Sequence, residues 1–354
     1  MSKKEINFVD QLKKLAVKSI LGFQTVLVFG LGRKIGIFDY LQEKGSEEST
    51  EVCFTLDEII QEITLDPVYL DAWMHMAITC GLFEVDKSCD QCLKTAPYIY
   101  HLLVDRNNMF YIGDILGGFY YMAPFQNEFF ESFKTGKTLD YFNLPYEVRK
   151  DVTRMSAVLG KKVIEIFTNS CDEHDRILKE GGHFLEIGCG YGFNLKNWIE
   201  KYPQAHFVGI DIDNQAIDHT KGLIAEHNWQ EQVKVENIEL NEYFHHDDQK
   251  FDVVLLNQVL HEMEPKGNYR QLVFNDIYSL LKDEGILIVG ETMIPGIFAP
   301  DQARYFEIMH KWFEVGIGSH FYDKDTFMEF IKTTPFKNAE LIFDDRDYIW
   351  VISK

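Results

Sequence analysis

The pattern of hydrophobic and polar positions divides the chain into two parts with different predicted architectures. From Phe8 to about Phe167 the pattern is mostly that of helices. From Gly181 onward, short apolar runs typical of strands alternate with helical patterns. Such alternation implies a mainly parallel sheet with helices on both faces, which is a doubly wound α/β fold. The sequence therefore predicts an α/β domain preceded by a mostly helical one.

The helical part follows the order helix, helix, helix, hairpin. A long apolar helix runs to about Leu41, and Thr55 or Asp57 caps a second helix at TLDEIIQEI. The dipeptide Asp66-Pro67 starts a third helix, because proline in a first turn costs no hydrogen bond. The segment FEVDKSCDQCLKTA then predicts two short strands around a polar turn. This order is typical of a winged-helix domain.

A winged helix either reads DNA or packs against a partner. The helix that would enter the DNA groove has no Lys or Arg, and its apolar residues are Tyr69, Leu70, Trp73, Met74, Met76 and Ile78. This composition favours dimerisation over DNA binding. We therefore expect a winged-helix-like dimerisation domain at 1–100, a helical linker and pocket segment at 101–175, and a ligand-binding α/β domain at 176–354.

Aromatic side chains crowd the segment between Tyr111 and Phe133. Its members are Phe119, Tyr120, Tyr121, Met122, Phe125, Phe129, Phe130 and Phe133. Most of them are expected to form core or dimer contacts, and some are candidates for the roof of a pocket that takes a flat, apolar ligand.

Charge and hydropathy bear on possible partners. The chain of 354 residues has a formal net charge of -21, which repels phosphate backbones and anionic lipid headgroups. The residues from Met1 to Gln11 are polar and charged, unlike a secretory signal. The uncharged stretch from Ser19 to Gly32 is too short to span a bilayer. We expect a soluble cytoplasmic protein with neither a nucleic-acid nor a membrane partner.

The cysteines suggest a structural role rather than a metal site. Cys89 and Cys92 form one C-x-x-C pair, and Cys53 and Cys80 lie nearby in the sequence, so a zinc site is conceivable. No second close pair completes the usual zinc spacing. The favoured interpretation is a turn between two strands with reduced thiols, and no metal is expected.

The segment HFLEIGCGYGFNL, residues 183–195, contains the strongest candidate for a ligand site. A short apolar strand leads into Gly188, Gly190 and Gly192, and a helical pattern follows. Glycines at such a turn let the backbone approach a ligand closely, as they also do in dinucleotide-binding turns. Glu186 lies inside the strand, where an unpaired carboxylate is costly. It is suited to a cationic amino-acid ligand, whereas a phosphate-binding turn would exclude it.

The next strand, HFVGIDID, ends in Asp211 and Asp213. An acidic residue at the end of the second strand can accept hydrogen bonds from both hydroxyls of a ribose. The alternative for Asp211 is the N-cap of the following helix.

Residues 181–295 resemble a class I S-adenosylmethionine-dependent methyltransferase, in which a Rossmann-like sheet binds the cofactor. The glycine motif, the Asp211 strand end and the segments FDVVLLNQVLHEM and LLKDEGILIVGE occur in family order. The winged-helix pattern and the pair HEM and GETMIP resemble the dimeric small-molecule O-methyltransferases. The resemblance implies a homodimer that binds S-adenosylmethionine and transfers its methyl group to a small-molecule acceptor.

The resemblance also assigns cofactor contacts. It places Glu186 and the glycines 188, 190 and 192 around the methionine part of S-adenosylmethionine. It places Asp211 and Ile212 beside the nucleoside, and Glu239 near the adenine, with Ile238 where the family usually has glycine. Asn257, at the end of the fourth strand, either helps to hold the amino acid of the cofactor or caps the strand.

A hydroxyl acceptor must lose a proton during methyl transfer, and His261 is the candidate general base. Glu291, at the end of a neighbouring strand, would orient the imidazole. The alternative is that His261 caps a helix or lines the site, as in enzymes that methylate carbon or nitrogen. Glu262 also competes for the role of base, although we expect it to face solvent. Family members have a second acidic partner further along the chain, but His320, Asp323 and Asp325 do not align with it.

Helix residues Met309, His310, Trp312 and Phe313 correspond to the acceptor-pocket wall in the resembling enzymes, although plain core packing is also compatible with their spacing. Two other functions stay open from the sequence. One is a transcription regulator that uses the winged helix on DNA and S-adenosylmethionine as an effector. The other is a protein that binds the cofactor without transferring its methyl group.

Overall fold

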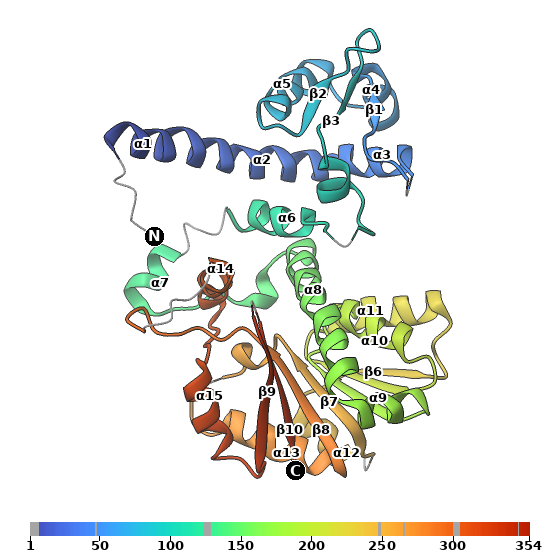
Figure 1. Cartoon of the computed structure of the whole chain (residues 1–354), viewed down its shortest axis with the longest axis vertical. Helices are drawn as coiled ribbons and strands as arrows, with labels where there is room; N and C mark the ends of the chain where they lie inside the picture. The colour runs from blue at the N-terminus through green and yellow to red at the C-terminus, as the bar shows by residue number, and fades with distance from the viewer. Residues whose placement is uncertain are drawn as a thin grey trace. The chain divides into compact units, whose positions relative to one another are not determined.

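The structure is a computed structural model that describes residues 7–46, 48–108, 110–123, 129–246, 249–264, 266–299, 305–345 and 347–354. The chain forms two compact units, Met1–Gln126 and Asn127–Lys354 (Figure 1). Each unit has its own hydrophobic core, so each is described separately.

The N-terminal unit packs helices against a small antiparallel sheet. Its helices are α1 (Phe8–Leu12), a π-helical stretch (Lys13–Ser19), α2 (Ile20–Lys34), α3 (Ile37–Lys44), α4 (Leu56–Ile63), α5 (Pro67–Thr79), a second π-helical stretch (Tyr100–Val104) and α6 (Gly113–Met122). Its strands are β1 (Cys53–Phe54), β2 (Phe83–Val85) and β3 (Leu93–Thr95), paired in the order β1-β3-β2. Phe29, Phe38, Phe83 and Trp73 form the centre of the core.

Two of the predicted helix starts are confirmed. Thr55 caps α4 in a capping box with Glu58, which decides between the two candidates for that cap. Asp66 caps α5, whose first residue is Pro67. The turn between β2 and β3 corrects the expectation for the cysteines, because Cys89 and Cys92 are joined by a disulfide instead of being reduced.

The first helical run is long and exposed. Phe8–Lys34 spans 27 residues and contains an 18-residue window with a mean hydropathy of 1.6, so by length and composition alone it could cross a membrane. The stretch 19–32, considered too short for this, is therefore part of a longer apolar helix. The core helices of soluble proteins and signal sequences can have the same length and apolar composition. The absence of a membrane partner therefore stays a prediction.

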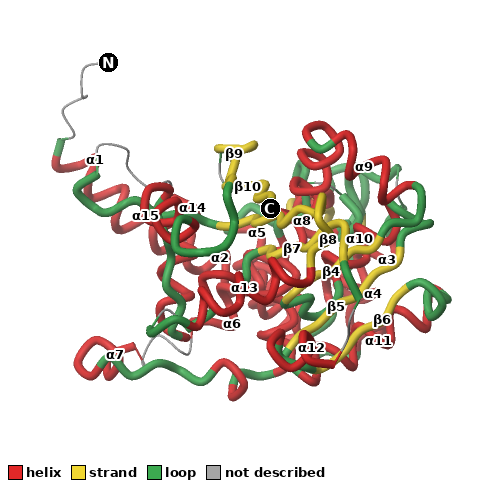
Figure 2. Tube along the Cα trace, turned by 90° about the horizontal axis from the view of Figure 1, so that it is seen from below, coloured by secondary structure: helices red, strands yellow, loops and turns green. Residues whose placement is uncertain are grey.

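The C-terminal unit is a doubly wound sheet, as predicted. In the described part of the chain it has seven strands in the order β6-β5-β4-β7-β8-β10-β9, of which β6 to β8 are parallel and β10 is antiparallel to both its neighbours (Figure 2). The strands are β4 (His183–Ile187), β5 (His206–Asp211), β6 (Val233–Asn237), β7 (Phe251–Asn257), β8 (Leu281–Glu291), β9 (Asn338–Asp344) and β10 (Tyr348–Ser353).

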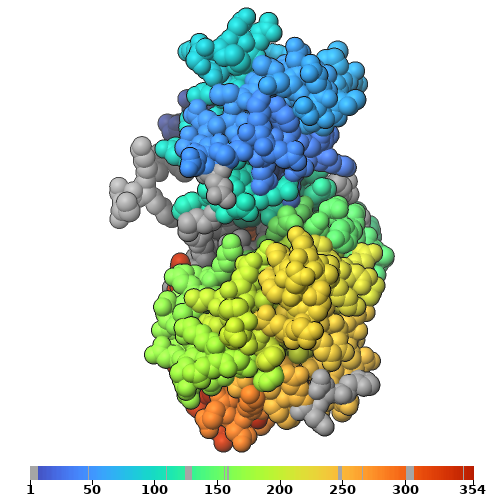
Figure 3. Space-filling model, turned by 90° about the vertical axis from the view of Figure 1, so that its right-hand side faces the viewer, coloured from blue at the N-terminus to red at the C-terminus, as the bar shows by residue number. Residues whose placement is uncertain are grey.

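Helices cover both faces of this sheet. One face packs on α8 (Tyr146–Ser170), α9 (Asp172–Lys179), α10 (Phe193–Lys201) and α11 (Asn214–His227), which are coloured green to yellow in Figure 3. The other face packs on α12 (Leu240–His246), α13 (Tyr269–Leu280) and α15 (Lys324–Ile331). The unit also contains α7 (Phe129–Thr135), α14 (Tyr305–Glu314) and 3₁₀ turns at Tyr141–Asn143, Leu260–Glu262 and Val315–Ile317. The strand order reverses between β4 and β7, the place where α/β sheets bind ligands at their carboxyl ends.

Candidate active site

The glycine turn after β4 has the backbone that the sequence predicts. Gly188, Gly190 and Gly192 have φ angles of 71°, 51° and 75°, a left-handed region that favours glycine. A Cβ at Gly188 would lie 2.5 Å from Val259, and one at Gly190 would lie 2.9 Å from Thr153. Glycine is therefore required here both by dihedral angle and by space.

Asp211 fastens this turn to the end of β5. Its carboxylate accepts hydrogen bonds from the N–H groups of Gly190 and Asp213, both at 2.7 Å. Burial raises the pKa of Asp211 above its ordinary value, and the N–H donors oppose that rise. Asp213 is the N-cap of α11, so the alternative role of Asp211 as the cap is wrong. Asp213 also binds Arg149 of α8 at 2.5 Å, a contact that the sequence does not reveal.

The predicted nucleoside contacts lie near this strand end. Ile212, which follows Asp211, is 59% exposed, an unusual exposure for isoleucine beside a buried strand. The N–H of Ile238 donates to the carbonyl of Asp211 at 3.1 Å, and Glu239 next to it is exposed at the start of α12. The structure thus brings Asp211, Ile212 and Glu239 to one edge of the sheet. Their contacts with a cofactor stay a prediction.

Glu186 is buried beside the glycine turn with only half of its carboxylate paired. One oxygen accepts a hydrogen bond from Nδ2 of Asn194 at 2.5 Å, and the other has no partner within the described residues. Burial raises the pKa of Glu186 to about 8, against the effect of the Asn194 hydrogen bond. A buried unpaired carboxylate oxygen is costly unless a cation completes the site. The residue thus fits the ammonium group of an amino-acid ligand.

Asn257 offers a similar acceptor at the end of the neighbouring strand β7. Its side chain is buried, and its Nδ2 donates to the carbonyl of Ser156 at 3.5 Å. Its Oδ1 has no hydrogen-bond partner in the described part of the chain. β4 and β7 are adjacent and parallel, so Glu186 and Asn257 present unsatisfied oxygens at the same edge of the sheet. This arrangement fits a ligand that supplies N–H donors.

His261 and Glu291 form a buried pair. His261 lies in the 3₁₀ turn Leu260–Glu262 after β7, Glu291 ends β8, and each is 1% exposed. Nδ1 of His261 lies 2.7 Å from Oε1 of Glu291, and the backbone N–H of His261 donates to Oε2 at 3.2 Å. A carboxylate only accepts, so Nδ1 carries the proton of this hydrogen bond. The structure therefore brings together the two residues predicted to be catalytic.

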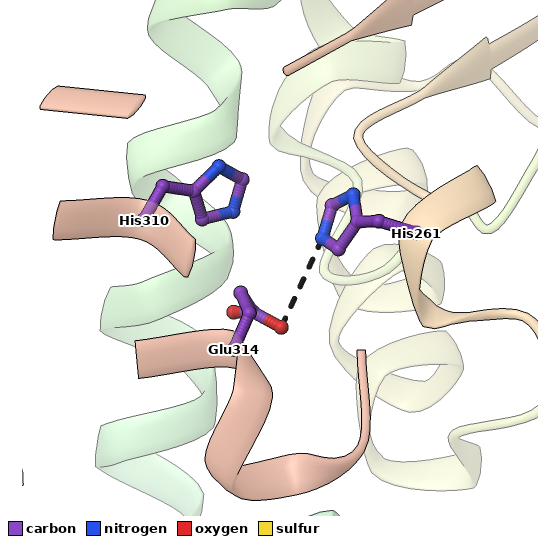
Figure 4. Close-up of side chains that lie close together, drawn as sticks. All are labelled: His261, His310 and Glu314. Atoms are coloured by element: carbon purple, nitrogen blue, oxygen red, sulfur yellow. Dashed lines mark ion pairs between the residues drawn. The ribbon is translucent and has the colours of Figure 1, made fainter. Parts of the chain in front are cut away.

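A second carboxylate approaches the other nitrogen of His261. Oε2 of Glu314 in α14 lies 3.8 Å from Nε2 of His261 (Figure 4). The same oxygen accepts a hydrogen bond from Ser319. The sequence directed attention to the following segment instead, where Asp323 caps α15 and Asp325 is exposed. The second acidic neighbour is thus Glu314. Its spacing of four residues from His310 placed both on one helix face, which was the available signal.

Neighbouring aromatic rings pack against the imidazole of His261, and neighbouring charges set its pKa. The ring of Phe321 stacks on the imidazole at 4.6 Å, and His310 meets it edge-on at 4.9 Å. Burial lowers the pKa of His261, but the charge and hydrogen bond of Glu291, helped by Glu314 and Glu262, outweigh it and raise the pKa to about 9. Glu262 is exposed, as expected.

The residues predicted to line a pocket, in α14 and in the aromatic segment, are partly buried and partly exposed. Trp312 is 46% exposed and packs against the ring of Phe133. Phe130 and Phe133 are exposed, whereas Met122 is buried in the N-terminal unit. Phe125 lies outside the described residues, as does the side chain of Phe129. The aromatic segment therefore contributes both core residues and exposed rings.

Comparison with known proteins agrees with the predicted class. Residues 185–287 match the model of a methyltransferase domain. An uncharacterized protein of Rickettsia prowazekii is 26% identical over 135 residues, which are 37% of this chain and 51% of that protein. The chain thus spans about half, or less, of the length of the curated relatives it matches.

Solved structures resemble the chain over nearly its whole length. Mitomycin 7-O-methyltransferase has a TM-score of 0.69 at 14% identity, covering 98% of this chain and 99% of its own. Human N-acetylserotonin methyltransferase in complex with SAM has a TM-score of 0.67 at 14% identity, covering 100% and 99%. An N,N-8-amino-8-demethyl-D-riboflavin dimethyltransferase from Streptomyces davawensis has a TM-score of 0.66 at 14% identity, covering 98% and 100%.

Residues 185–287 thus match a methyltransferase domain, within a chain that has the same fold as these solved methyltransferase structures. The predicted fold is confirmed, and the predictions of a methyltransferase and of S-adenosylmethionine as its cofactor agree with these comparisons.

Proposed function

We propose that this protein transfers the methyl group of S-adenosylmethionine to a hydroxyl oxygen of a small molecule, with His261 as general base. The observation that carries the proposal is the His261–Glu291 pair, because it fixes the imidazole with Nε2 free of hydrogen bonds among the described residues. In the neutral form of the imidazole, a nitrogen held in this way can accept a proton from an acceptor hydroxyl, and the share of that form grows as the pH rises toward the pKa of about 9.

The cofactor site is supported by unsatisfied oxygens. S-adenosylmethionine supplies a methyl group on a sulfonium, which is already a good leaving group. Glu186 and Asn257 would hold its ammonium group, because each presents a buried oxygen without a partner in the described chain. Asp211 would accept hydrogen bonds from the ribose, since each of its oxygens keeps a lone pair beyond its bond to the backbone.

His261 acts at the acceptor side of this arrangement. Its Nε2 takes the hydroxyl proton, and Glu291 stabilises the resulting imidazolium through Nδ1. Among the structurally similar proteins, the name mitomycin 7-O-methyltransferase indicates an oxygen acceptor. The name of the riboflavin-type N,N-dimethyltransferase indicates an amino acceptor. The buried base is the feature that favours oxygen here, because proton removal matters most for a hydroxyl.

The experiment has two parts. Calorimetry with S-adenosylmethionine and its demethylated product is expected to show binding, and an absence of heat and of thermal stabilisation would contradict the cofactor assignment. Incubation with methyl-labelled cofactor and a panel of phenols, catechols, carboxylic acids and amines is expected to label hydroxyl acceptors. Labelling confined to amines would contradict the assignment to oxygen.

We further propose a cytoplasmic homodimer joined through a winged-helix-like N-terminal unit. Its support is the series of exposed apolar side chains along the first helical run, which are Phe8, Leu12, Leu15, Ile20 and Phe23. Monomeric proteins seldom leave large apolar surfaces in water, so we expect a partner to cover these side chains.

A further inference from the structure

The proposed base and two neighbouring side chains converge like the ligands of a metal ion. His261, His310 and Glu314 each offer one ligand atom, and these atoms all lie within 4.8 Å of one another (Figure 4). His261 comes from the turn after β7, whereas His310 and Glu314 lie one turn apart on α14. His261 and Glu314 are almost fully buried.

Two consecutive residues at the end of β8 orient the two imidazoles, because each contacts the Nδ1 atom of one ring. Nδ1 of His261 bonds Glu291 at 2.7 Å, and Nδ1 of His310 bonds Oγ1 of Thr292 at 2.9 Å. Nε2 of each ring is therefore directed into the cluster, as Figure 4 shows. Metal-binding histidines are typically held through their second nitrogen in this way. A general base needs only one such histidine, so the proposed proton transfer leaves His310 without a role.

We propose that His261, His310 and Glu314 bind a zinc ion, and that the ion inhibits methyl transfer by occupying Nε2 of His261. Two imidazole nitrogens and one carboxylate oxygen with an open fourth position are a common zinc donor set. Ligand atoms around tetrahedral zinc lie about 3.4 Å apart, given bonds of about 2.0–2.1 Å. The Nε2–Oε2 separation of 3.8 Å is close to that value.

Charge also favours a cation at this place. Glu291 lies directly behind His261, so a further carboxylate stands against the cluster. The zinc site itself stands on this geometry alone. Only its inhibitory effect rests on the proposed function, because a metal and a proton cannot both occupy Nε2.

The test measures metal binding apart from turnover. The full-length protein is titrated with Co²⁺, whose visible absorption reports tetrahedral coordination, and with Zn²⁺ in competition with a chromophoric chelator. We expect one tight site in the wild type. His310→Asn and Glu314→Gln should each weaken Zn²⁺ binding by more than about tenfold, and Thr292→Val, which removes an orienting partner, by about tenfold.

His320→Asn is the matched control, because His320 is exposed and its Nδ1 bonds the carbonyl of Gly318 outside the cluster. It should keep wild-type zinc affinity. Equal zinc binding by His310→Asn and His320→Asn, with both variants folded by circular dichroism, would overturn the site. So would a wild-type Co²⁺ spectrum without tetrahedral absorption.

Activity separates the two proposals. Zn²⁺ should abolish methyl transfer by the wild type, and a chelator should restore it. Zinc binding with undiminished turnover would refute the inhibition, whereas zinc binding by a protein that methylates no acceptor would refute the proposed function and leave the site intact.

Discussion

At the scale of single residues, the site combines buried charges with specific partners. Glu291 satisfies both the imidazole and the backbone N–H of His261, so the base is held in one orientation. Glu186 has one satisfied oxygen and one unsatisfied oxygen. Unpaired buried polar atoms destabilise the fold, so their presence at the glycine turn points to a ligand.

Substitution of His261 tests its role directly. His261→Asn should lower kcat on a hydroxyl acceptor by about 10²- to 10⁴-fold, because general-base catalysis contributes about that much. Glu291→Gln should cause a smaller loss, because the amide oxygen still accepts from Nδ1 without stabilising the imidazolium. Steady-state kinetics measure both, with His320→Asn as the control. Full turnover by His261→Asn would exclude the base role.

Glu186 predicts a pH dependence of cofactor affinity. Its pKa of about 8 means that the ligand-free protein holds the proton at about pH 7. A bound ammonium favours the ionised carboxylate, so binding lowers this pKa and releases a proton. Affinity should therefore rise with pH up to about 8.

Calorimetry in buffers of different ionisation enthalpy measures this proton release. The wild type should release up to one proton per cofactor at about pH 7, and Glu186→Gln should lack that contribution. Equal release by both proteins would show that another group titrates.

At the scale of elements, the site is built where three strands end. The turn after β4, the end of β5 and the turn after β7 bring together the glycines, Asp211 and His261. The sequence predicts these elements because apolar runs, glycines and acidic ends are local signals. It did not reveal Arg149 on Asp213, since that contact joins residues 64 positions apart.

The glycine turn can be tested with a matched pair of alanine variants. Gly188→Ala combines a left-handed φ of 71° with a Cβ 2.5 Å from Val259. The backbone strain alone costs about 1–2 kcal/mol, so the variant should lower the Tm and weaken cofactor binding. Gly222→Ala in α11 has nothing within 4 Å and should be neutral or slightly stabilising. Thermal unfolding and calorimetry compare them. Equal behaviour would show that the turn tolerates a side chain.

At the scale of the whole molecule, the open question is what covers the first helical run. Its exposed apolar residues fit a second copy of the chain, and its length and hydropathy also satisfy a membrane-span test. The net charge of -21 disfavours DNA and anionic lipid as partners.

Light scattering decides between these arrangements. We expect a dimer for the wild type and a monomer for the double variant Leu15→Glu, Phe23→Glu, because both side chains are more than half exposed in one chain. Flotation with neutral vesicles is the companion measurement. A wild-type monomer that floats with vesicles would contradict the homodimer.

The sequence by itself determined the doubly wound sheet, the glycine turn, the helix cap at Asp66 and the identity of the His261–Glu291 pair. Each depends on a local pattern or on strand ends that a parallel sheet brings to one edge. The choice of Thr55 over Asp57 as the cap of α4 came from the structure. Only the tertiary structure decided that Glu314 approaches His261, that His310 joins it and that Asp213 rather than Asp211 caps α11. The first two contacts join α14 to a turn some fifty residues earlier, and their formation depends on how helices pack on the sheet, which no local spacing specifies.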